Sequence, residues 1–338
     1  MITTTRRRVL QGTLGLAAAS TFYIPRFAGA AEFNYKYSNN LAPSHPMNIR
    51  AKEAVDRIRE ETDGRVSIEI FPASQLGTDS DVLSQLRAGG VEFFTMAGAL
   101  LASLVPLCAI DGMAYAFPDY PTVWKAMDGE LGALLRAEIS KYGIVAMDKV
   151  WDNGFHQITT RATPINTPAD LEGLKIRTGA SALQVTMCQA FGASPVSLSF
   201  NELYTALQTG IVDAQLNALV IMQTGKLYEV QKHCAMTNHM WSGFWFLANK
   251  AAWEAIPEDL REIVAKHLNE AGVNERADIE QLNLSLMDQL KGEGVEFTTP
   301  DAQPFRDVLA EKGFYKEWKE KLGEEAWAAL EAAAGKLG

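Results

Sequence analysis

The strongest constraint on the fold is a repeated switch between strand and helix periodicity in the hydrophobic residues. Alternating apolar residues predict strands over 33–37, 66–70 and 91–97, and apolar residues three and four apart predict helices over 51–58 and 81–88. Such a run predicts a mostly parallel sheet with helices on both faces. Ligands bind these sheets beyond the carboxyl ends of the strands, so we expect the loops that follow the strands to line a crevice.

The same alternation begins again in the second half of the chain. Its predicted elements are strands over 155–160, 174–178 and 211–216 and helices over 181–191, 201–209 and 219–230. Two α/β series in a chain of 338 residues predict two lobes with a small-molecule cleft between them. Residues 257–292 predict one long helix, or two in series, that bridges the lobes, and residues 305–334 predict an amphipathic helical tail.

The first thirty residues are typical of a twin-arginine export signal. Arg6, Arg7 and Arg8 precede an apolar stretch of about 13 residues, and Ala28-Gly29-Ala30 suits cleavage after Ala30. The apolar stretch is shorter than the roughly 20 residues that a membrane-spanning helix needs. We therefore expect a soluble periplasmic protein, with an uncleaved anchor or a cytoplasmic basic arm as the alternative.

Charge and motif content argue against several function classes. The net charge is −10, and the four arginines within residues 1–30 leave the remainder at −14, without the dense positive surface that nucleic acid requires. The sequence contains no phosphate-binding loop, nucleophile elbow or HExxH zinc motif. Cys108, Cys188 and Cys234 include no Cys-x-x-Cys pair and are expected to be buried structural thiols. We expect no enzyme activity, no cofactor and no metal.

Two segments of the second half carry a resemblance to a known family. They are Asp170-Leu171-Glu172-Gly173-Leu174-Lys175-Ile176-Arg177-Thr178 and SFNELYTALQTGIVDAQLN over residues 199–217, with a further match at PASQLG over 72–77. Together they resemble the periplasmic solute-binding proteins of TRAP transporters, the DctP family, over nearly the whole chain after residue 30.

The resemblance implies an α/β, two-lobed periplasmic-binding-protein (Venus-flytrap) fold with a long interlobe helix. We place lobe one at residues 32–153 plus 243–282 and lobe two at residues 154–242 plus 283–338. The chain is expected to cross between the lobes near 151–154 and again near 241–243, where it supplies hinge residues.

Arg177 and Asn217 are the leading candidates for ligand contact. Arg177 ends the predicted strand 174–178, where a guanidinium can hold a carboxylate in a planar two-point fork. The resemblance assigns this arginine to the substrate carboxylate. Asn217 follows the next strand and matches a family ligand contact, and its amide can donate to the same carboxylate or accept from a hydroxyl. The alternatives are a surface arginine in an ion pair and a turn-forming asparagine.

Two departures from the family pattern bear on the ligand. Many members carry an arginine where this sequence has His156, in Gly154-Phe155-His156, so a permanent cation becomes a titratable or neutral donor. The change favours a monocarboxylate over a dicarboxylate or an acidic sugar. Leu216 replaces an acid in the family's Gly-Gln-Glu-Asn segment, which removes a possible cation ligand.

Large aromatic residues are expected to form part of the ligand site. Residues 240–246 place several rings on alternate faces of a crossing strand, and we expect Trp241 to face the ligand, with core packing as the alternative. Asn40 and Phe200 match positions that line the cleft in relatives, and Trp151 is expected at the hinge or in the core. Such a wall suits an aryl or otherwise hydrophobic acid.

These features predict a periplasmic solute-binding protein that captures a small organic carboxylate. A monocarboxylate with an aromatic or hydrophobic body is favoured, and a C4-dicarboxylate or a sugar acid is the alternative. The resemblance implies delivery of the closed complex by a monomer to the membrane subunits of a TRAP-type secondary transporter. An exported enzyme and a binding protein that serves a sensor are more distant alternatives.

Overall fold

The computed structural model describes residues 31–337, and the predicted export signal lies outside these residues. The strands are β1 (Phe33–Ser38), β2 (Val66–Phe71), β3 (Phe93–Ala97), β4 (Ile144–Ala146), β5 (Trp151–Thr160), β6 (Lys175–Thr178), β7 (Ser194–Ser197), β8 (Ala214–Ala218), β9 (His233–Asn249) and β10 (Glu296–Thr298). The α-helices are α1 (Pro46–Glu61), α2 (Asp79–Ala88), α3 (Gly98–Leu101), α4 (Tyr120–Met127), α5 (Glu130–Ser140), α6 (Ala182–Ala190), α7 (Phe200–Thr209), α8 (Leu219–Thr224), α9 (Lys250–Ala255), α10 (Glu258–Gly292), α11 (Ala302–Glu311), α12 (Phe314–Leu322) and α13 (Glu324–Ala334). Short 3-10 helices are η1 (Pro106–Gly112), η2 (Pro168–Leu171) and η3 (Leu227–Glu229).

The ten strands within residues 31–337 belong to one sheet whose main path is β2-β1-β3-β9-β5-β8-β6-β7, and β4 and β10 pair with β9. The two ends are parallel, as the β/α alternation predicts: β2, β1 and β3 at one end, and β8, β6 and β7 at the other. The middle is antiparallel, because β9 pairs in this sense with β3 and β5, and β5 does so with β8. The sheet is therefore mixed, with a parallel α/β unit at each end.

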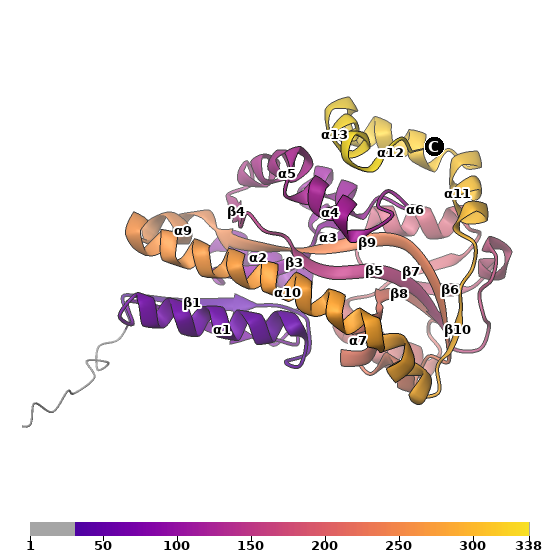
Figure 1. Cartoon of the computed structure of the whole chain (residues 1–338), viewed down its shortest axis with the longest axis horizontal. Helices are drawn as coiled ribbons and strands as arrows, with labels where there is room; N and C mark the ends of the chain where they lie inside the picture. Colours follow the sequence, from indigo (N-terminus) through magenta and orange to yellow (C-terminus); the bar gives the residue numbers. More distant parts are fainter. Residues whose placement is uncertain (1–30, 338) are drawn as a thin grey trace, which may run out of the picture. The chain divides into compact units, whose positions relative to one another are not determined.

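The long strands β5 and β9 run side by side through the middle of the sheet (Figure 1). Trp151 pairs with Phe244, and Phe155 pairs with Trp241. The register shifts between Asp152 and Gly154 and again after His156, so the strand pair is irregular next to the predicted crossings. Gly154 has a φ of 104°, a conformation that a residue with a side chain rarely adopts.

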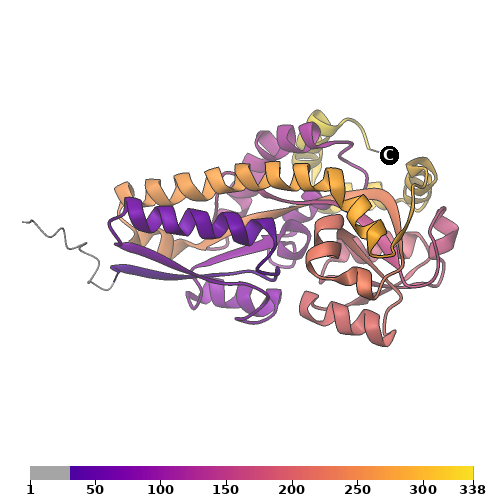
Figure 2. The same ribbon diagram turned by 60° about the horizontal axis from the view of Figure 1, so that its bottom comes forward.

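The sequence predicts either one long helix or two helices in series over residues 257–292. The structure has a single helix there, α10. It has 35 residues, which corresponds to about 50 Å at 1.5 Å per residue. Its buried stripe includes Leu260, Val264, Leu268, Ile279 and Leu286, and the helix packs along α1 and against α8 and β5 (Figures 1 and 2). The predicted long helix is confirmed.

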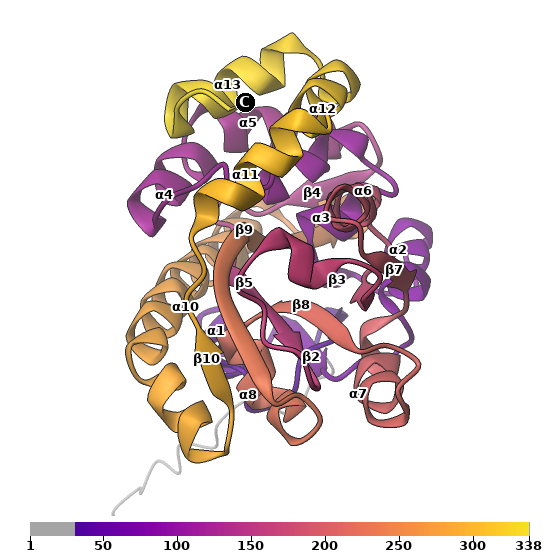
Figure 3. The same ribbon diagram turned by 90° about the vertical axis from the view of Figure 1, so that its right-hand side faces the viewer.

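The C-terminal helices fold back over elements from earlier in the chain. α13 packs against α4 and α5, and α12 packs against η1 and α6 (Figure 3). Trp318 of α12 and Trp327 of α13 are buried there. The tail therefore joins two predicted lobes in one packing layer, and the lobe boundaries given above stay a prediction.

Some local predictions differ from the structure. The helix expected over 219–230 ends at Thr224, because Lys226 adopts a left-handed φ of 53° that the α-helix cannot continue through. Strand β7 was not expected, because Pro195 interrupts a segment too short to show alternation.

The three cysteines are buried and unpaired, as predicted. Burial raises the pKa of Cys188 and of Cys234 to about 12, which keeps both as thiols. No helix within residues 31–337 is both long enough and apolar enough to cross a membrane.

Candidate functional site

A cavity of about 50 Å³ lies where β1, β3, β6 and β8 lead into the segments that follow them, with β5 and β9 completing its wall. The prediction that a crevice forms beyond the carboxyl ends of the parallel strands is confirmed. Its lining is Asn40, Leu41, Ala97, Ala99, Leu100, Asn153, His156, Arg177, Gly179, Gln184, Phe200, Leu216, Asn217, Ile221, Ser242 and Phe244.

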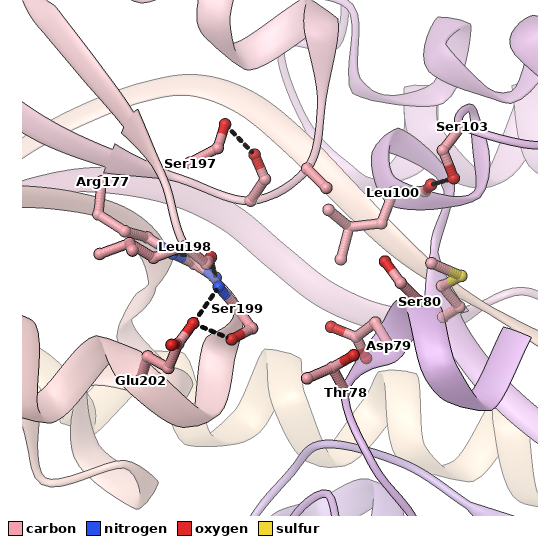
Figure 4. A pocket seen from close by; sticks show the side chains of 13 residues that line it. Thr78, Asp79, Ser80, Leu100, Ser103, Arg177, Ser197, Leu198, Ser199 and Glu202 are labelled. Carbon is pink, nitrogen blue, oxygen red and sulfur yellow. Dashed lines mark hydrogen bonds between the residues drawn. The ribbon is translucent and has the colours of Figure 1, made fainter.

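A second cavity of about 170 Å³ adjoins the first and shares Leu100, Arg177 and Gly179 with it (Figure 4). Its other lining residues are Thr78, Asp79, Ser80, Met96, Ser103, Ala180, Ser197, Leu198, Ser199 and Glu202. The first cavity is mostly apolar, whereas the second carries two carboxylates. Arg177 belongs to both.

Five of the six predicted ligand-binding residues line the smaller cavity: Asn40, His156, Arg177, Phe200 and Asn217. They come from five different strands, helices or loops, and the sheet topology brings them together. This convergence is geometric, and contact with a ligand stays a prediction. Trp241 is the exception.

Arg177 presents a buried guanidinium to the cavity. The residue is 6% exposed, and Nε and Nη2 donate to the backbone carbonyl of Leu198 at 3.0 and 2.8 Å. Nη1 has no hydrogen-bond partner among residues 31–337. Burial lowers the pKa of Arg177 to about 10, although Asp79 and Glu202 act in the opposite direction. The guanidinium is thus anchored along one edge and free to bind along another.

The two carboxylates of the adjoining cavity are engaged by their own neighbours. Glu202 accepts from the backbone and hydroxyl of Ser199 in the capping box that begins α7. Asp79, in the first turn of α2, accepts from Asn40, and its burial raises its pKa. Figure 4 shows Asp79 and Glu202 on opposite sides of the cavity. Neither lies within ion-pair distance of Arg177.

His156 is a neutral side chain of the cavity wall. It is buried on β5, and its Nε2 lies 3.3 Å from Asn153 Nδ2. Burial, and to a lesser extent Arg177, lowers the pKa of His156 to about 3. The sequence left a cationic and a neutral His156 open, and this environment favours the neutral form at neutral pH.

Trp241 does not line the cavity, so the expectation that its ring faces the ligand disagrees with this geometry. Its neighbours on β9, Ser242 and Phe244, line the cavity instead. Successive strand residues point to opposite faces, and Trp241 therefore lies on the far face. There its Nε1 donates to Asp152 Oδ1 at 2.8 Å, and its ring packs edge-on against Phe117 and Trp124.

The aromatic part of the wall comes from Phe200 and Phe244. Phe200 also lies near Arg177, whose Cζ is 5.9 Å from the ring centre. Trp151, expected at the hinge or in the core, is fully buried against Phe246. It belongs to the core at the start of β5.

The sequence interpretation missed Asn153, Gln184, Ser242 and Phe244 as lining residues. Asn153 lies three residues before His156. Phe244 lies in the same predicted strand as Trp241, three residues later, and therefore on the opposite face. Neither position in the sequence predicts which face of the strand lines the cavity. Among residues 31–337 no group of three or more His, Cys, Asp or Glu side chains is placed to hold a metal ion.

Comparisons with known proteins identify the family of the chain. The chain matches the DctP family, described as bacterial extracellular solute-binding protein, family 7, over residues 37–321. It is 32% identical over 336 residues to the C4-dicarboxylate-binding periplasmic protein DctP of Rhodobacter capsulatus, which covers 97% of this chain and 98% of the relative. It is 31% identical over 296 residues to the 2,3-diketo-L-gulonate-binding periplasmic protein YiaO of Escherichia coli K12, covering 87% and 88%.

Solved structures share the fold. A TRAP periplasmic solute-binding protein from Sulfurospirillum deleyianum, crystallised with bound succinate, matches with a TM-score of 0.84 at 28% identity. The match covers 90% of this chain and 99% of that one. The likeness confirms the predicted two-lobed α/β fold.

Proposed function

The chain belongs to the DctP family of TRAP periplasmic solute-binding proteins, and we propose that it captures a small organic monocarboxylate in the cavity around Arg177. The observation that carries the proposal is a buried guanidinium with no carboxylate in contact among residues 31–337. An unpaired buried charge costs on the order of several kcal/mol, which a bound carboxylate offsets. The planar donor pattern of arginine suits that group.

A single negative charge on the ligand fits the charges around the site. Arg177 is the one arginine or lysine among the described residues that line the two cavities, and His156 is neutral beside it. A second ligand carboxylate would meet Asp79 or Glu202 in the adjoining cavity. Like charges at short range repel, so this arrangement favours a monocarboxylate over a dicarboxylate.

The body of the ligand is proposed to be short and apolar. Leu41, Leu100, Phe200, Leu216 and Phe244 supply an apolar wall. A cavity of roughly 150 Å³ can hold benzene in another protein, and this cavity measures about 50 Å³. The size favours an aliphatic body over an aryl one, and Trp241 no longer supports an aromatic preference. A sugar acid, as in the name of the Escherichia coli relative, is the alternative.

Binding is proposed to hold the cleft closed, because the ligand would contact both predicted lobes. Asn40 and Leu41 precede the crossing at β5, whereas Arg177 and Asn217 follow it. A ligand that contacts both sides binds the closed form better and so shifts the population toward it. The monomeric closed complex would then deliver the acid to a TRAP membrane transporter, after export directed by residues 1–30.

Calorimetry and thermal melting of the purified protein test this proposal. We expect short monocarboxylates to bind and to raise the melting temperature by mass action, and succinate, gluconate and benzoate to bind more weakly or not at all. Arg177→Lys keeps the charge but loses the fork, and we expect it to lose most of the affinity. Arg306→Lys is the matched control, because Arg306 also donates to a backbone carbonyl, that of Tyr115, away from the cavity.

Two outcomes contradict the proposal. Binding of succinate or gluconate alone would retain the family and reject the monocarboxylate. Equal affinity in wild type and Arg177→Lys would remove Arg177 from the site.

A further inference from the structure

Two asparagine side chains of the cavity direct their amide nitrogens toward protein acceptors. Asn217 Nδ2 donates to Gln215 Oε1 at 2.6 Å, and Asn40 Nδ2 lies 3.0 Å from each carboxylate oxygen of Asp79. Neither Oδ1 atom has a hydrogen-bond partner within residues 31–337, and neither is among the fully buried unpaired atoms there. Both oxygens are therefore accessible from the cavity that their residues line.

A chain of buried hydrogen bonds orients Asn217. Gln231 Nε2 donates to the backbone carbonyl of Val230 at 3.0 Å, and Gln231 Oε1 accepts from Thr159 Oγ1 at 3.1 Å. Thr159 Oγ1 in turn accepts from Gln215 Nε2 at 2.7 Å. Gln231, Thr159 and Gln215, which we call the amide relay, are each at most 1% exposed.

The amide relay has one direction because it begins at a backbone carbonyl. That oxygen can only accept, so Gln231 presents Nε2 to it and Oε1 to Thr159. The single hydroxyl hydrogen of Thr159 goes to Gln231, so the hydroxyl oxygen accepts from Gln215. Reversing any one amide would bring two oxygens, or two amide nitrogens, together in a buried place, where unpaired polar groups are costly. The relay therefore leaves Asn217 Oδ1 for the cavity.

Asn40 is oriented independently. A carboxylate accepts hydrogen bonds and does not donate them, so Asp79 holds the Nδ2 end of Asn40 and leaves Oδ1 free. Asn153 is a third amide of the cavity: its Nδ2 lies 3.3 Å from His156 Nε2, and its buried Oδ1 has no partner among the described residues. The cavity thus combines one cationic donor with amide oxygens that can only accept, and with the Ser242 hydroxyl, which can donate or accept.

From this arrangement, and resting on the proposed function, we propose that the protein selects small 2-hydroxy monocarboxylic acids over the matching 2-oxo and unsubstituted acids. The carboxylate binds Arg177, and the neighbouring hydroxyl donates to an amide oxygen, that of Asn217 first. Arg177 and Asn217 line the same cavity of about 50 Å³, so a ligand bound to both has its carboxylate and its hydroxyl close together. A 2-oxo oxygen would face an amide oxygen, and a protonated amine would add a positive charge beside Arg177.

Two matched ligand series test the selectivity by calorimetry on the wild-type protein: lactate, pyruvate and propionate, and 2-hydroxybutyrate, 2-oxobutyrate and butyrate. We expect the hydroxy acid of each series to bind at least about tenfold more tightly than its partners, because they leave a buried acceptor unpaired. Equal or tighter binding of the 2-oxo acids overturns this inference and leaves the proposed function intact. If none of the six acids binds, the proposed function fails, and the inference fails with it.

A variant of the relay gives a second test. Thr159 does not line the cavity and is a positioning residue. Thr159→Val keeps its shape but removes the hydroxyl that orients Gln215, so we expect the ratio of hydroxy-acid to oxo-acid affinity to fall to within about threefold of unity.

Thr160→Val is the matched control. Thr160 is the next residue of β5, is equally buried, and donates to the carbonyl of Thr163 outside the relay. We expect this variant to keep the wild-type ratio. A loss of overall affinity in both variants at a constant ratio would contradict an orienting role for Thr159.

Discussion

Replacing Arg177 by methionine separates two roles that a buried arginine can have, that of a structural anchor and that of a ligand contact. In the ligand-free protein the charge is unfavourable, since burial lowers the pKa of Arg177 to about 10. At about 1.4 kcal/mol per pKa unit, this amounts to about 3 kcal/mol against the charged folded state. The two hydrogen bonds to Leu198 act the other way, and leaving that carbonyl unpaired costs about 1–3 kcal/mol.

The net effect on the free energy of unfolding is therefore small. We expect Arg177→Met without ligand to be between unchanged and about 2 kcal/mol more stable than wild type. Ligand affinity should instead fall by about 2–5 kcal/mol, the usual effect of truncating one partner of a buried charged pair. That range corresponds to roughly thirtyfold to several thousandfold in Kd.

Urea denaturation without ligand and calorimetry with the tightest-binding acid measure the two quantities on the same preparations. A variant that loses more than about 3 kcal/mol of stability while its affinity is unchanged would refute a ligand-binding role for Arg177. That result would make Arg177 an anchor of the β6–α7 region and not a ligand contact.

Three further predictions concern the packing around the site. Burial raises the pKa of Asp152 to about 7, so the wild type loses stability as pH rises from about 4 to 7. Asp152→Asn should therefore be more stable than the wild type by as much as about 4 kcal/mol at pH 8, and not at pH 4. An equal difference at both pH values in urea denaturation would contradict this. Gly272→Ala places a Cβ 2.8 Å from Trp151 Nε1 and should lower stability by about 1–3 kcal/mol. Gly292→Ala, with open space in the same helix, should not lower it. Similar melting temperatures for the two variants would be evidence against tight packing of α10. Trp241→Phe removes the hydrogen bond to Asp152 and should lower the melting temperature. Ligand affinity should stay within about threefold of the wild type, because the ring lies outside the cavity. A large loss of affinity in calorimetry would instead indicate that Trp241 contacts the ligand.

The neutral state of His156 changes how the site is expected to respond to pH. A histidine that bound as a cation would lose affinity for an acid as pH rose through its pKa. With a pKa of about 3, His156 is neutral from pH 5 to 8, and its own titration contributes no change in affinity over that interval. Charge recognition then depends on Arg177, which stays protonated throughout.

Much of the architecture follows from local patterns. The periodicity of residues 33–97 predicts the parallel strands β2, β1 and β3 with their helices, and the stripe over 257–292 predicts α10, since both depend on spacings within one element. Arg177 and Asn217 could be selected because each ends a predicted strand and matches the family. Their meeting in one cavity with Asn40, from the other end of the sheet, depends on the strand order.

The tertiary structure alone decides which polar and aromatic atoms face the cavity. β9 is buried on both faces, so the run from Met240 to Phe246 carries no inside-outside alternation, and the choice between Trp241 and Phe244 depends on what packs against each face. The orientation of the Asn217 amide depends on partners 2 to 72 residues apart along the relay. The sequence by itself determined most of the longer elements, the family and the candidate cation of the site, because these depend on local spacing and residue type. The acceptor pattern beside that cation arises only when distant strands bring their side chains into one hydrogen-bonded chain.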